Sequence, residues 1–315
     1  MFKDLLKKIN EFDKITIFHH ERPDGDAVFS SYALKEYINL NFKNKKVYLV
    51  GNDQYDVLNS VFKVKDSIIK DSLCIVLDTA TKARVDDKRC FELSKYLIKI
   101  DHHPAYENYG DLNYVDDLCP ATCQYLAEIF FSKTFAKYKL NEKICKLLYS
   151  GIVTDTMCFK TASCNYKTFD VASKLLKIGK FNSADIYFDV FSKDIKEFNA
   201  LTKLRTYAKF DKKVGYIIVN QKDLVKIKLN YDRVKNNVDL LSNLKDVNIW
   251  AVFVENKKTK LYDGSIRSLN GYVINDIARK YNGGGHKYAV GVKGLKKADI
   301  IRLIKELQSV KKAHK

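Results

Sequence analysis

Proline, histidine and long apolar segments are scarce in this chain of 315 residues, which contains three prolines and six histidines. No apolar run approaches the roughly 18 residues that a membrane-spanning helix needs, so we expect no association with a membrane. None of the seven cysteines lies in a C-x-x-C pair, which argues against a zinc ribbon or a dithiol redox motif. The segment 1–14 lacks the apolar centre of a signal peptide and predicts a short amphipathic helix. We therefore expect a cytoplasmic protein.

Basic residues exceed acidic ones, with 56 Lys and Arg against 38 Asp and Glu and a formal net charge of +18. This balance favours an anionic partner such as a nucleic acid or a nucleotide. A second interpretation is that an AT-rich genome enriches the chain in Lys and Asn, as in the segment 39–46. Charge alone leaves both interpretations open.

Strand-like and helix-like patterns alternate along the first half of the chain. Short apolar, β-branched segments predict strands at 14–19, 46–50, 73–77 and 96–100. Periodic apolar patterns predict helices near 27–41, 121–131, 142–150 and 168–178. This alternation predicts an α/β fold with a mostly parallel sheet flanked by helices.

A second alternating block follows a charged helical stretch, and no Gly/Pro-rich linker separates the two blocks. Its predicted strands and helices lie at 214–219, 247–255 and 260–268, and at 231–244, 273–281 and 297–310, respectively. We therefore expect a domain at 1–183, a helical linker at 184–210 and a smaller α/β domain at 211–315.

The scarce residues are clustered. Four of the six histidines form two adjacent pairs, and two of the three prolines share their loops: His19-His20 with Pro23, and His102-His103 with Pro104. Each pair comes at the end of a predicted strand, and so does Asp78. Because the loops at the carboxyl ends of parallel strands build the functional sites of α/β folds, we expect these residues to meet.

Aspartates accompany the histidines. They are Asp24 and Asp26 in His20-Glu-Arg-Pro-Asp-Gly-Asp26, Asp78, Asp101, and Asp155 in Gly151-Ile-Val-Thr-Asp-Thr156. Any one of them alone could be a helix cap, but carboxylates held close together repel each other unless a cation neutralises them. Oxygen and imidazole ligands suit manganese, magnesium or cobalt better than structural zinc. The combination predicts a centre for two divalent ions, with manganese, magnesium and cobalt as the candidates.

In this order, the motifs resemble those of the DHH phosphoesterase family. The matching segments are His20 to Asp26, Asp78, Asp101-His102-His103 and Gly151 to Thr156. Towards the C-terminus, Ser265-Ile-Arg-Ser268 and Gly283-Gly-Gly-His286 resemble the DHHA1 substrate-binding domain of that family. The resemblance covers nearly the whole chain. It fails at Asn282 and Met157, which stand where related proteins often carry glycine.

The resemblance implies a role for each matched residue. One ion would be held by His20 and Asp24, the other by Asp26, His102 and Asp155, and Asp78 would bridge both. His103 would face the substrate phosphate, and Asp101 would orient a histidine. The substrate would be bound by Arg267, Gly283, Gly284, Gly285 and His286. His19 falls outside the matched pattern and has no implied role.

The resemblance also implies the reaction, that of a manganese-dependent phosphodiesterase or phosphatase in the family's nanoRNase and pAp-phosphatase branch. A hydroxide held between the two ions would hydrolyse short oligoribonucleotides (nanoRNA) to mononucleotides, 3′-phosphoadenosine 5′-phosphate (pAp) to AMP, or both. The main alternative is a cyclic-di-AMP or pApA phosphodiesterase on the same scaffold. A RecJ-like exonuclease, an inorganic pyrophosphatase and a non-catalytic nucleic-acid-binding protein are less favoured. Short RNA or a nucleotide is the expected partner, and a homodimer is left open.

Overall fold

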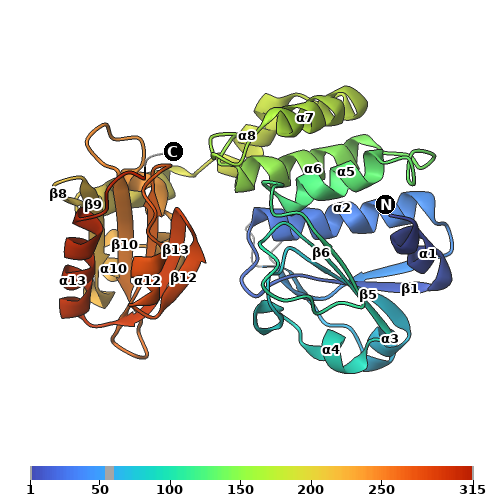
Figure 1. Ribbon diagram of the computed structural model, residues 1–315, viewed down its shortest axis with the longest axis horizontal. Helices are drawn as coiled ribbons and strands as arrows, with labels where there is room; N and C mark the ends of the chain where they lie inside the picture. Colours follow the sequence, from blue (N-terminus) through green and yellow to red (C-terminus); the bar gives the residue numbers. More distant parts are fainter. Residues whose placement is uncertain (1, 54–59, 314–315) are drawn as a thin grey trace. The chain divides into compact units, whose positions relative to one another are not determined.

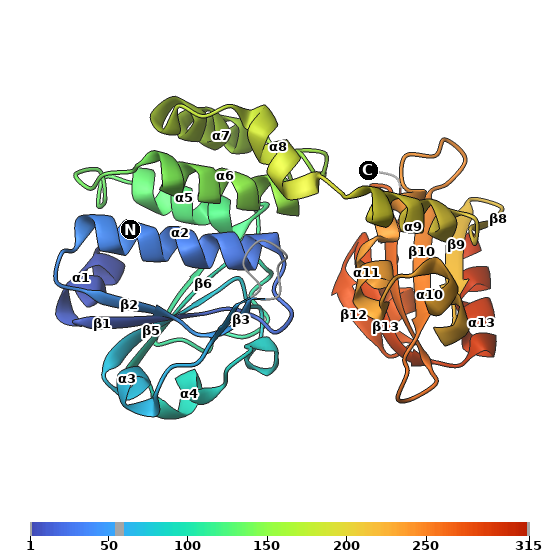
Figure 2. The ribbon, with the colours of Figure 1, turned by 180° about the vertical axis from the view of Figure 1, so that it is seen from behind.

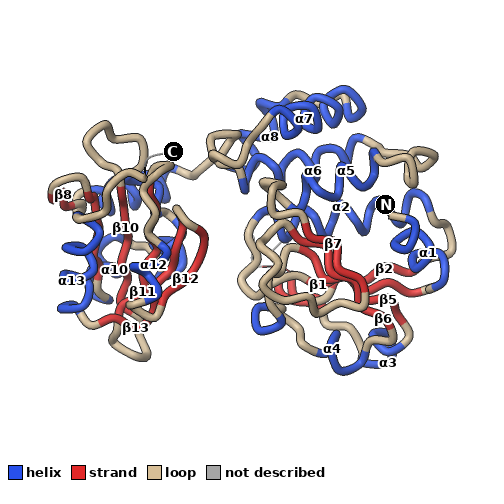
Figure 3. Tube along the Cα trace, in the orientation of Figure 1, coloured by secondary structure: helices blue, strands red, loops and turns tan. Residues whose placement is uncertain are grey.

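The computed structural model describes residues 2–53 and 60–313, and the chain divides into two compact units between Ser192 and Lys193. Each unit is built on one main β-sheet with helices against it, as Figures 1 and 3 show, so the predicted α/β class is confirmed. Within the described ranges, no helix is long and apolar enough to cross a lipid bilayer.

The first unit contains a five-stranded sheet in the order β2-β1-β5-β6-β7, and all neighbouring strands run parallel. The strands are β1 (Lys14–Phe18), β2 (Lys46–Leu49), β5 (Ser72–Leu77), β6 (Tyr96–Asp101) and β7 (Leu112–Val115). β5 is buried along its whole length, and β1 and β6 are buried except at their first residue. Burial on both faces explains why these strands consist of nearly continuous apolar residues. A separate antiparallel ribbon pairs β3 (Gly51–Asp53) with β4 (Ser60–Phe62).

Helices cover both faces of this sheet (Figures 1 and 2). The helices are α1 (Lys3–Glu11), α2 (Gly25–Asn41), α3 (Asp66–Lys70), α4 (Arg89–Leu93), α5 (Thr122–Phe131), α6 (Glu142–Asp155), α7 (Tyr166–Gly179) and α8 (Ser183–Phe191). One face packs against α1, α2, α5 and α6 around residues such as Ile15, Leu34 and Leu126, and α7 lies outside α6. The other face packs against α3 and α4 around Phe18 and Cys90. In a parallel sheet covered on both faces, a functional site is expected in the loops at the carboxyl ends of the strands.

The second unit contains a six-stranded mixed sheet in the order β12-β13-β11-β10-β9-β8, in which only β9 and β10 run parallel. Its strands are β8 (Lys209–Asp211), β9 (Val214–Val219), β10 (Ile249–Glu255), β11 (Tyr262–Ser268), β12 (Gly283–His286) and β13 (Ala289–Leu295). Its helices are α9 (Ile195–Arg205), α10 (Gln221–Ile227), α11 (Tyr231–Asn236), α12 (Asn275–Arg279) and α13 (Lys297–Gln308). One sheet face packs against α9, α10 and α11, and the other against α12 and α13.

Several elements lie where the sequence predicted none. The helices α3, α4 and α10 have five to seven residues, too few for an apolar period to be recognised. The glycine segment 283–285 belongs to strand β12, which was not predicted because glycine has a low strand propensity. The single helix predicted at 231–244 is divided at Asn237 into α11 and a 3₁₀ turn, Val238–Leu241. The segment 184–210 contains most of α8 in the first unit and all of α9 in the second.

Candidate metal centre

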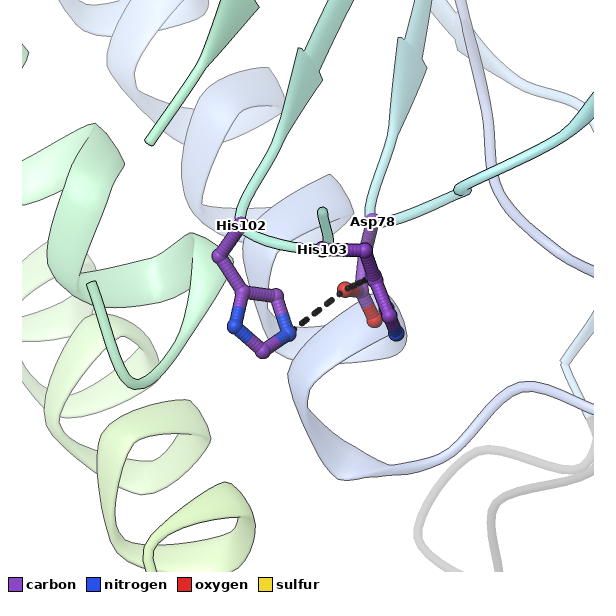
Figure 4. Close-up of side chains that lie close together, drawn as sticks. All are labelled: Asp78, His102 and His103. Carbon is purple, nitrogen blue, oxygen red and sulfur yellow. Dashed lines mark ion pairs between the residues drawn. The ribbon is translucent and has the colours of Figure 1, made fainter. Parts of the chain in front are cut away.

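Three neighbouring strands of the first sheet bring histidines and aspartates to one edge. His20 lies two residues after the end of β1, and Asp78 directly follows β5. Asp101 is the last residue of β6 and is followed by His102 and His103. Because β1, β5 and β6 are adjacent and parallel, their carboxyl ends lie together. Figure 4 shows the side chains of His102 and His103 beside Asp78.

The side chains form three overlapping groups that could hold metal ions, and the ligand atoms within each group lie within 4.8 Å of one another. The groups are His20–Asp24–Asp78, Asp26–His102–Asp155 and Asp78–His102–His103. Asp78 and His102 each belong to two groups, so the three groups form one continuous centre. The structure thus brings together all six residues that the sequence predicted as ligands.

The Nε2 atoms of two histidines face carboxylates. Nε2 of His20 lies 3.6 Å from Oδ2 of Asp78 and 3.7 Å from Oδ2 of Asp24. Nε2 of His102 lies 3.4 Å from Oδ1 of Asp78 and 3.4 Å from Oδ2 of Asp155. These N···O distances are longer than those of well-formed hydrogen bonds, so the nitrogen and carboxylate oxygen atoms face one another without pairing closely.

Backbone carbonyls orient the same two rings. Nδ1 of His20 lies 3.0 Å from the carbonyl oxygen of Glu21, and Nδ1 of His102 lies 3.2 Å from that of Cys119. A ring that donates from Nδ1 to a carbonyl presents an unprotonated Nε2, which is how metal-binding histidines are usually held. The orientation of both rings is compatible with binding of a metal ion through Nε2.

The N-terminus of α5 orients two of the aspartates. The backbone N–H groups of Thr122 and Cys123 donate to the two carboxylate oxygens of buried Asp26, at 2.6 and 2.9 Å. The hydroxyl of Thr122 also donates to Oδ1 of Asp78, at 3.1 Å. A helix N-terminus favours negative charge, so α5 holds both carboxylates in place. Asp24 lies beside Asp26 as the N-cap of α2.

Two glycines allow α2 and α6 to approach each other beneath the centre. A Cβ atom at Gly25 would lie 2.6 Å from Cγ2 of Thr154. A Cβ atom at Gly151 would lie 2.9 Å from Oδ1 of Asp26 and would overlap the side chain of Cys123. Any larger residue at either position would therefore displace the elements that carry the aspartates.

Three residues in or next to the matched motifs have a left-handed backbone. The φ angles are 52° at Asp78, 48° at Met157 and 52° at Asn282. Asp and Asn tolerate this region better than most side chains, whereas Met does not. At residues 157 and 282, glycine would adopt these φ angles without strain.

Carboxyl groups are concentrated at this centre, although the chain as a whole is basic. Burial and the nearby carboxylates of Asp78 and Asp155 raise the pKa of Asp26 well above its usual range. Burial and neighbouring aspartates also raise the pKa of Asp155 to about 7, against the opposing effect of His102. Carboxylates in this situation take up protons unless cations neutralise them. The oxygen and imidazole donors therefore fit divalent metal ions.

Asp101 and His103 form a pair at the end of β6. Oδ1 of Asp101 lies 2.8 Å from Nδ1 of His103 and accepts the backbone N–H of His103 at 3.2 Å. The same ring nitrogen is 3.5 Å from Oδ1 of Asp78. Asp101 is fully buried, so it fixes the orientation of the His103 ring.

Sequence reasoning missed other residues near the centre besides those of α5. Nη2 of Arg84 lies 3.4 Å from Nδ1 of His20, and the Arg84 carbonyl accepts the N–H of Glu21 at 2.7 Å. A lone exposed arginine in a turn gives no pattern that could have found it. His19, which had no implied role, is buried with Nε2 3.2 Å from the carbonyl oxygen of Asn52, and it connects β1 to β3.

The residues predicted to bind substrate lie on neighbouring strands of the second unit. Arg267 of β11 is paired with Ala289 of β13, which is paired in turn with His286 of β12. Arg267 and His286 therefore occupy one row across three strands. Nη1 of Arg267 donates to the carbonyl of Ile266 at 3.0 Å, and burial lowers the pKa of this guanidinium. The side chain of His286 lies outside the described part of the structure.

The three glycines of β12 have different surroundings. A Cβ atom at Gly283 would lie 2.7 Å from the carbonyl oxygen of Ala278, and one at Gly285, where φ is 134°, would lie 2.9 Å from Cα of Val290. The fold therefore requires glycine at both positions. Gly284 is exposed and a Cβ atom there would have no neighbour within 4 Å, so packing does not require glycine at this position.

Comparison with known proteins finds relatives that align over the whole chain. A Streptococcus mutans protein described as a probable bifunctional oligoribonuclease and PAP phosphatase NrnA is 34% identical over 319 residues, covering 99% of each chain. The bifunctional oligoribonuclease and PAP phosphatase NrnA of Bacillus subtilis is 29% identical over 321 residues, covering 100% of each. The crystal structure of an exopolyphosphatase-related protein from Bacteroides fragilis has the same fold, with a TM-score of 0.86 at 20% identity over 98% of this chain and 95% of that one.

Family comparison gives the same domain order as the motifs. The N-terminal domain of the DHH family matches residues 14–152, and the DHHA1 domain matches residues 211–313. Since both domains match in order and a relative above 30% identity aligns over its whole length, the chain belongs to the DHH family and carries a C-terminal DHHA1 domain.

Proposed function

We propose that this chain is a two-metal phosphoesterase that hydrolyses short oligoribonucleotides to mononucleotides and pAp to AMP in the cytoplasm. The observation that carries the proposal is the continuous His–Asp centre formed by three overlapping groups at one sheet edge. Full-length relatives named for oligoribonuclease and PAP phosphatase activities support the substrate class.

The proposed ligands divide between two divalent ions, for which we propose Mn²⁺. One ion would be held by His20, Asp24 and Asp78, and the other by Asp26, His102, Asp155 and Asp78. Bound cations supply Lewis acidity that activates water and neutralises charge on the phosphoryl oxygens. The N–H donors of α5 keep the carboxylates oriented for this purpose.

The remaining residues are proposed to hold the substrate. His103, fixed through Nδ1 by Asp101, would contact the phosphoryl group that reacts. Arg267 and the backbone of β12 would bind a further phosphate of the substrate through charge-assisted and N–H contacts. In the reaction the oxygen of water forms a bond to phosphorus, the bond from phosphorus to the 3′ oxygen breaks, and that oxygen takes a proton.

A hydrolysis panel tests the proposal. The substrates are a 5′-phosphorylated RNA dinucleotide, a 24-mer RNA, pAp, cyclic-di-AMP and pyrophosphate, each assayed with Mn²⁺, Mg²⁺ or Co²⁺ and again with EDTA. We expect EDTA-sensitive release of mononucleotides from the dinucleotide and of AMP from pAp, and little reaction of the 24-mer.

Each other outcome changes a specific part of the proposal. Activity on cyclic-di-AMP or pyrophosphate alone would retain the metal centre and reject the substrate. Binding of RNA without hydrolysis under any metal would reject the enzyme. Sedimentation of the same preparation distinguishes a monomer from a homodimer.

A further inference from the structure

Lys99 is a fully buried lysine in the middle of the apolar strand β6, with no exposed surface. Burying an ammonium group is costly unless every N–H group finds a partner of suitable charge or polarity. Lys99 lies two residues before Asp101, and therefore directly beneath the loop that carries His102 and His103. None of the roles proposed above uses it.

The ammonium group of Lys99 contacts three separate segments. It donates to the carbonyl oxygen of Ala80, at 3.0 Å, in the loop that follows β5 and carries Asp78. It donates to the carbonyl oxygen of Glu107, at 3.1 Å, in the loop that follows β6. Its third contact is Oδ2 of Asp101, at 3.2 Å. Two of its N–H groups thus hold the two loops, and its positive charge lies beside the buried carboxylate.

The two carboxylate oxygens of Asp101 have different neighbours. Its Oδ1 holds His103, as described above, whereas its Oδ2 accepts no hydrogen bond of good geometry from any residue in the described ranges. The ammonium of Lys99 is therefore the positive charge that balances this buried oxygen. A continuous chain runs from Lys99 through Asp101 to His103.

A tyrosine strengthens the same connection. The ring of Tyr109 lies 4.8 Å from Nζ of Lys99, a cation–π distance. The hydroxyl of Tyr109 donates to the carbonyl oxygen of Thr79 at 2.7 Å, which joins the loop after β6 to the residue that follows Asp78. Asp78 has a left-handed backbone, so its position depends on such neighbouring contacts.

We propose that Lys99 is a positioning residue that fixes the Asp78 loop and the His103 ring relative to each other. The effect that we expect on turnover rests on the proposed function, whereas the effect that we expect on Mn²⁺ affinity does not. Loss of the ammonium would free the Ala80 and Glu107 carbonyls and leave the Asp101 carboxylate buried without a counter-charge. Asp78 and His103 would then no longer be held together.

The test compares three single variants of the full chain. Lys99→Met keeps the length of the side chain but removes its charge and its donors. Lys95→Met is the matched control, because Lys95 is exposed just before β6 and its nearest carboxylate, Asp71, is 4.0 Å away. Tyr109→Phe removes only the hydroxyl that joins the two loops. The measurements are Mn²⁺ affinity by electron paramagnetic resonance without substrate, kcat and KM on the RNA dinucleotide, and thermal unfolding.

For Lys99→Met we expect Mn²⁺ to bind about tenfold more weakly and kcat to fall about 10- to 100-fold, the range for residues that orient metal ligands. KM should change less than kcat, because Lys99 acts on His103 only through Asp101. Among the described residues, the hydrogen bonds and ion pair of its side chain are with Ala80, Glu107 and Asp101, and neither Arg267 nor β12 is among these partners. Tyr109→Phe should weaken Mn²⁺ binding about threefold, as expected for one hydrogen bond. Lys95→Met should behave as the unmodified protein.

A Lys99→Met protein that is less stable to heat, but has the Mn²⁺ affinity and kcat of Lys95→Met, would show a purely structural lysine and reject the proposal. If Lys99→Met does not fold, Tyr109→Phe decides, and unchanged Mn²⁺ affinity and kcat in that variant reject it. Mn²⁺ binding requires no substrate. A protein that hydrolyses nothing in the panel, yet loses Mn²⁺ affinity on substitution of Lys99, would reject the proposed function while supporting this inference.

Discussion

Substitution of Gly151 by alanine should disturb both the stability of the first unit and its metal centre. The added Cβ atom would lie 2.8 Å from Cβ of Cys123 and 2.9 Å from Oδ1 of Asp26, and still closer to the Cys123 sulfur. Real Cβ atoms do not approach neighbours this closely, so α6 must move away from α5 or α2 must shift. A shift of α2 would separate Asp26 from the two N–H groups that hold it, and a movement of α6 would displace Asp155, which α6 carries.

The expected magnitude follows from two opposing effects. Forcing one extra methyl group into a packed interior costs about 1–3 kcal/mol. Replacing glycine by alanine inside a helix returns roughly 0.5–1 kcal/mol. With both effects near the middle of their ranges, the free energy of unfolding should fall by about 1 kcal/mol, which corresponds to roughly 2–4 °C in Tm for a unit of this size. Mn²⁺ affinity should fall as well, by about tenfold, because the orientation of a ligand is disturbed.

Thermal unfolding followed by circular dichroism and Mn²⁺ titration measure the two effects. Gly291→Ala is the control for stability, because a Cβ atom there meets only the carbonyl oxygen of Gly264, at an ordinary 3.7 Å. A Gly151→Ala protein with the Tm and the Mn²⁺ affinity of the unmodified chain would refute the argument that close packing of α2, α5 and α6 positions Asp26.

Three further substitutions probe other parts of the molecule. Asp78→Asn retains a residue that tolerates φ of 52° but removes the shared charge, so kcat should fall at least about 100-fold with an unchanged circular dichroism spectrum; retention of full activity with added Mn²⁺ would reject the two-metal assignment. Gly284→Ala should fold normally, because its Cβ meets nothing, and should raise KM for the RNA dinucleotide if substrate approaches β12; an unchanged KM would place the substrate elsewhere. Met157→Gly should stabilise the protein by about 0.5–1 kcal/mol because it relieves the strain of a left-handed backbone, whereas Asn282→Gly should change stability little. Equal changes in the free energy of unfolding of the two variants, measured in urea, would contradict this explanation.

Residues at the ends of strands could be recognised from the sequence because two signals coincide there. His20, Asp78 and Asp101 are polar residues that directly follow or end apolar segments, and the histidines are rare elsewhere in the chain. The order of strands in a parallel sheet then brings them together. Their meeting is observed in the structure, whereas their roles as ligands and catalytic groups stay predictions until the variants are measured.

Contacts between distant segments could not be recognised in the same way. Asp26 is held by backbone N–H groups that lie 96 and 97 residues further along the chain, and a backbone group has no signature in the sequence. The lysine at position 99 was visible as a charge inside a predicted strand, but nothing in the sequence names its partners. Strand β12 was missed because glycine lacks the side chain on which strand prediction depends.

The dependence of the centre on both α2 and the end of α6 has a consequence for the timing of its assembly. Asp155, the last residue of the metal-binding groups, is the final residue of α6, and α5 must already be docked for Asp26 to be held. A ribosome adds about 5–20 residues per second, so the complete set of donors exists only after roughly 8–30 s of synthesis. In the proposed centre, both ions would therefore be held only after α6 has been synthesised. Fragments that end before residue 155 should emerge without a complete centre.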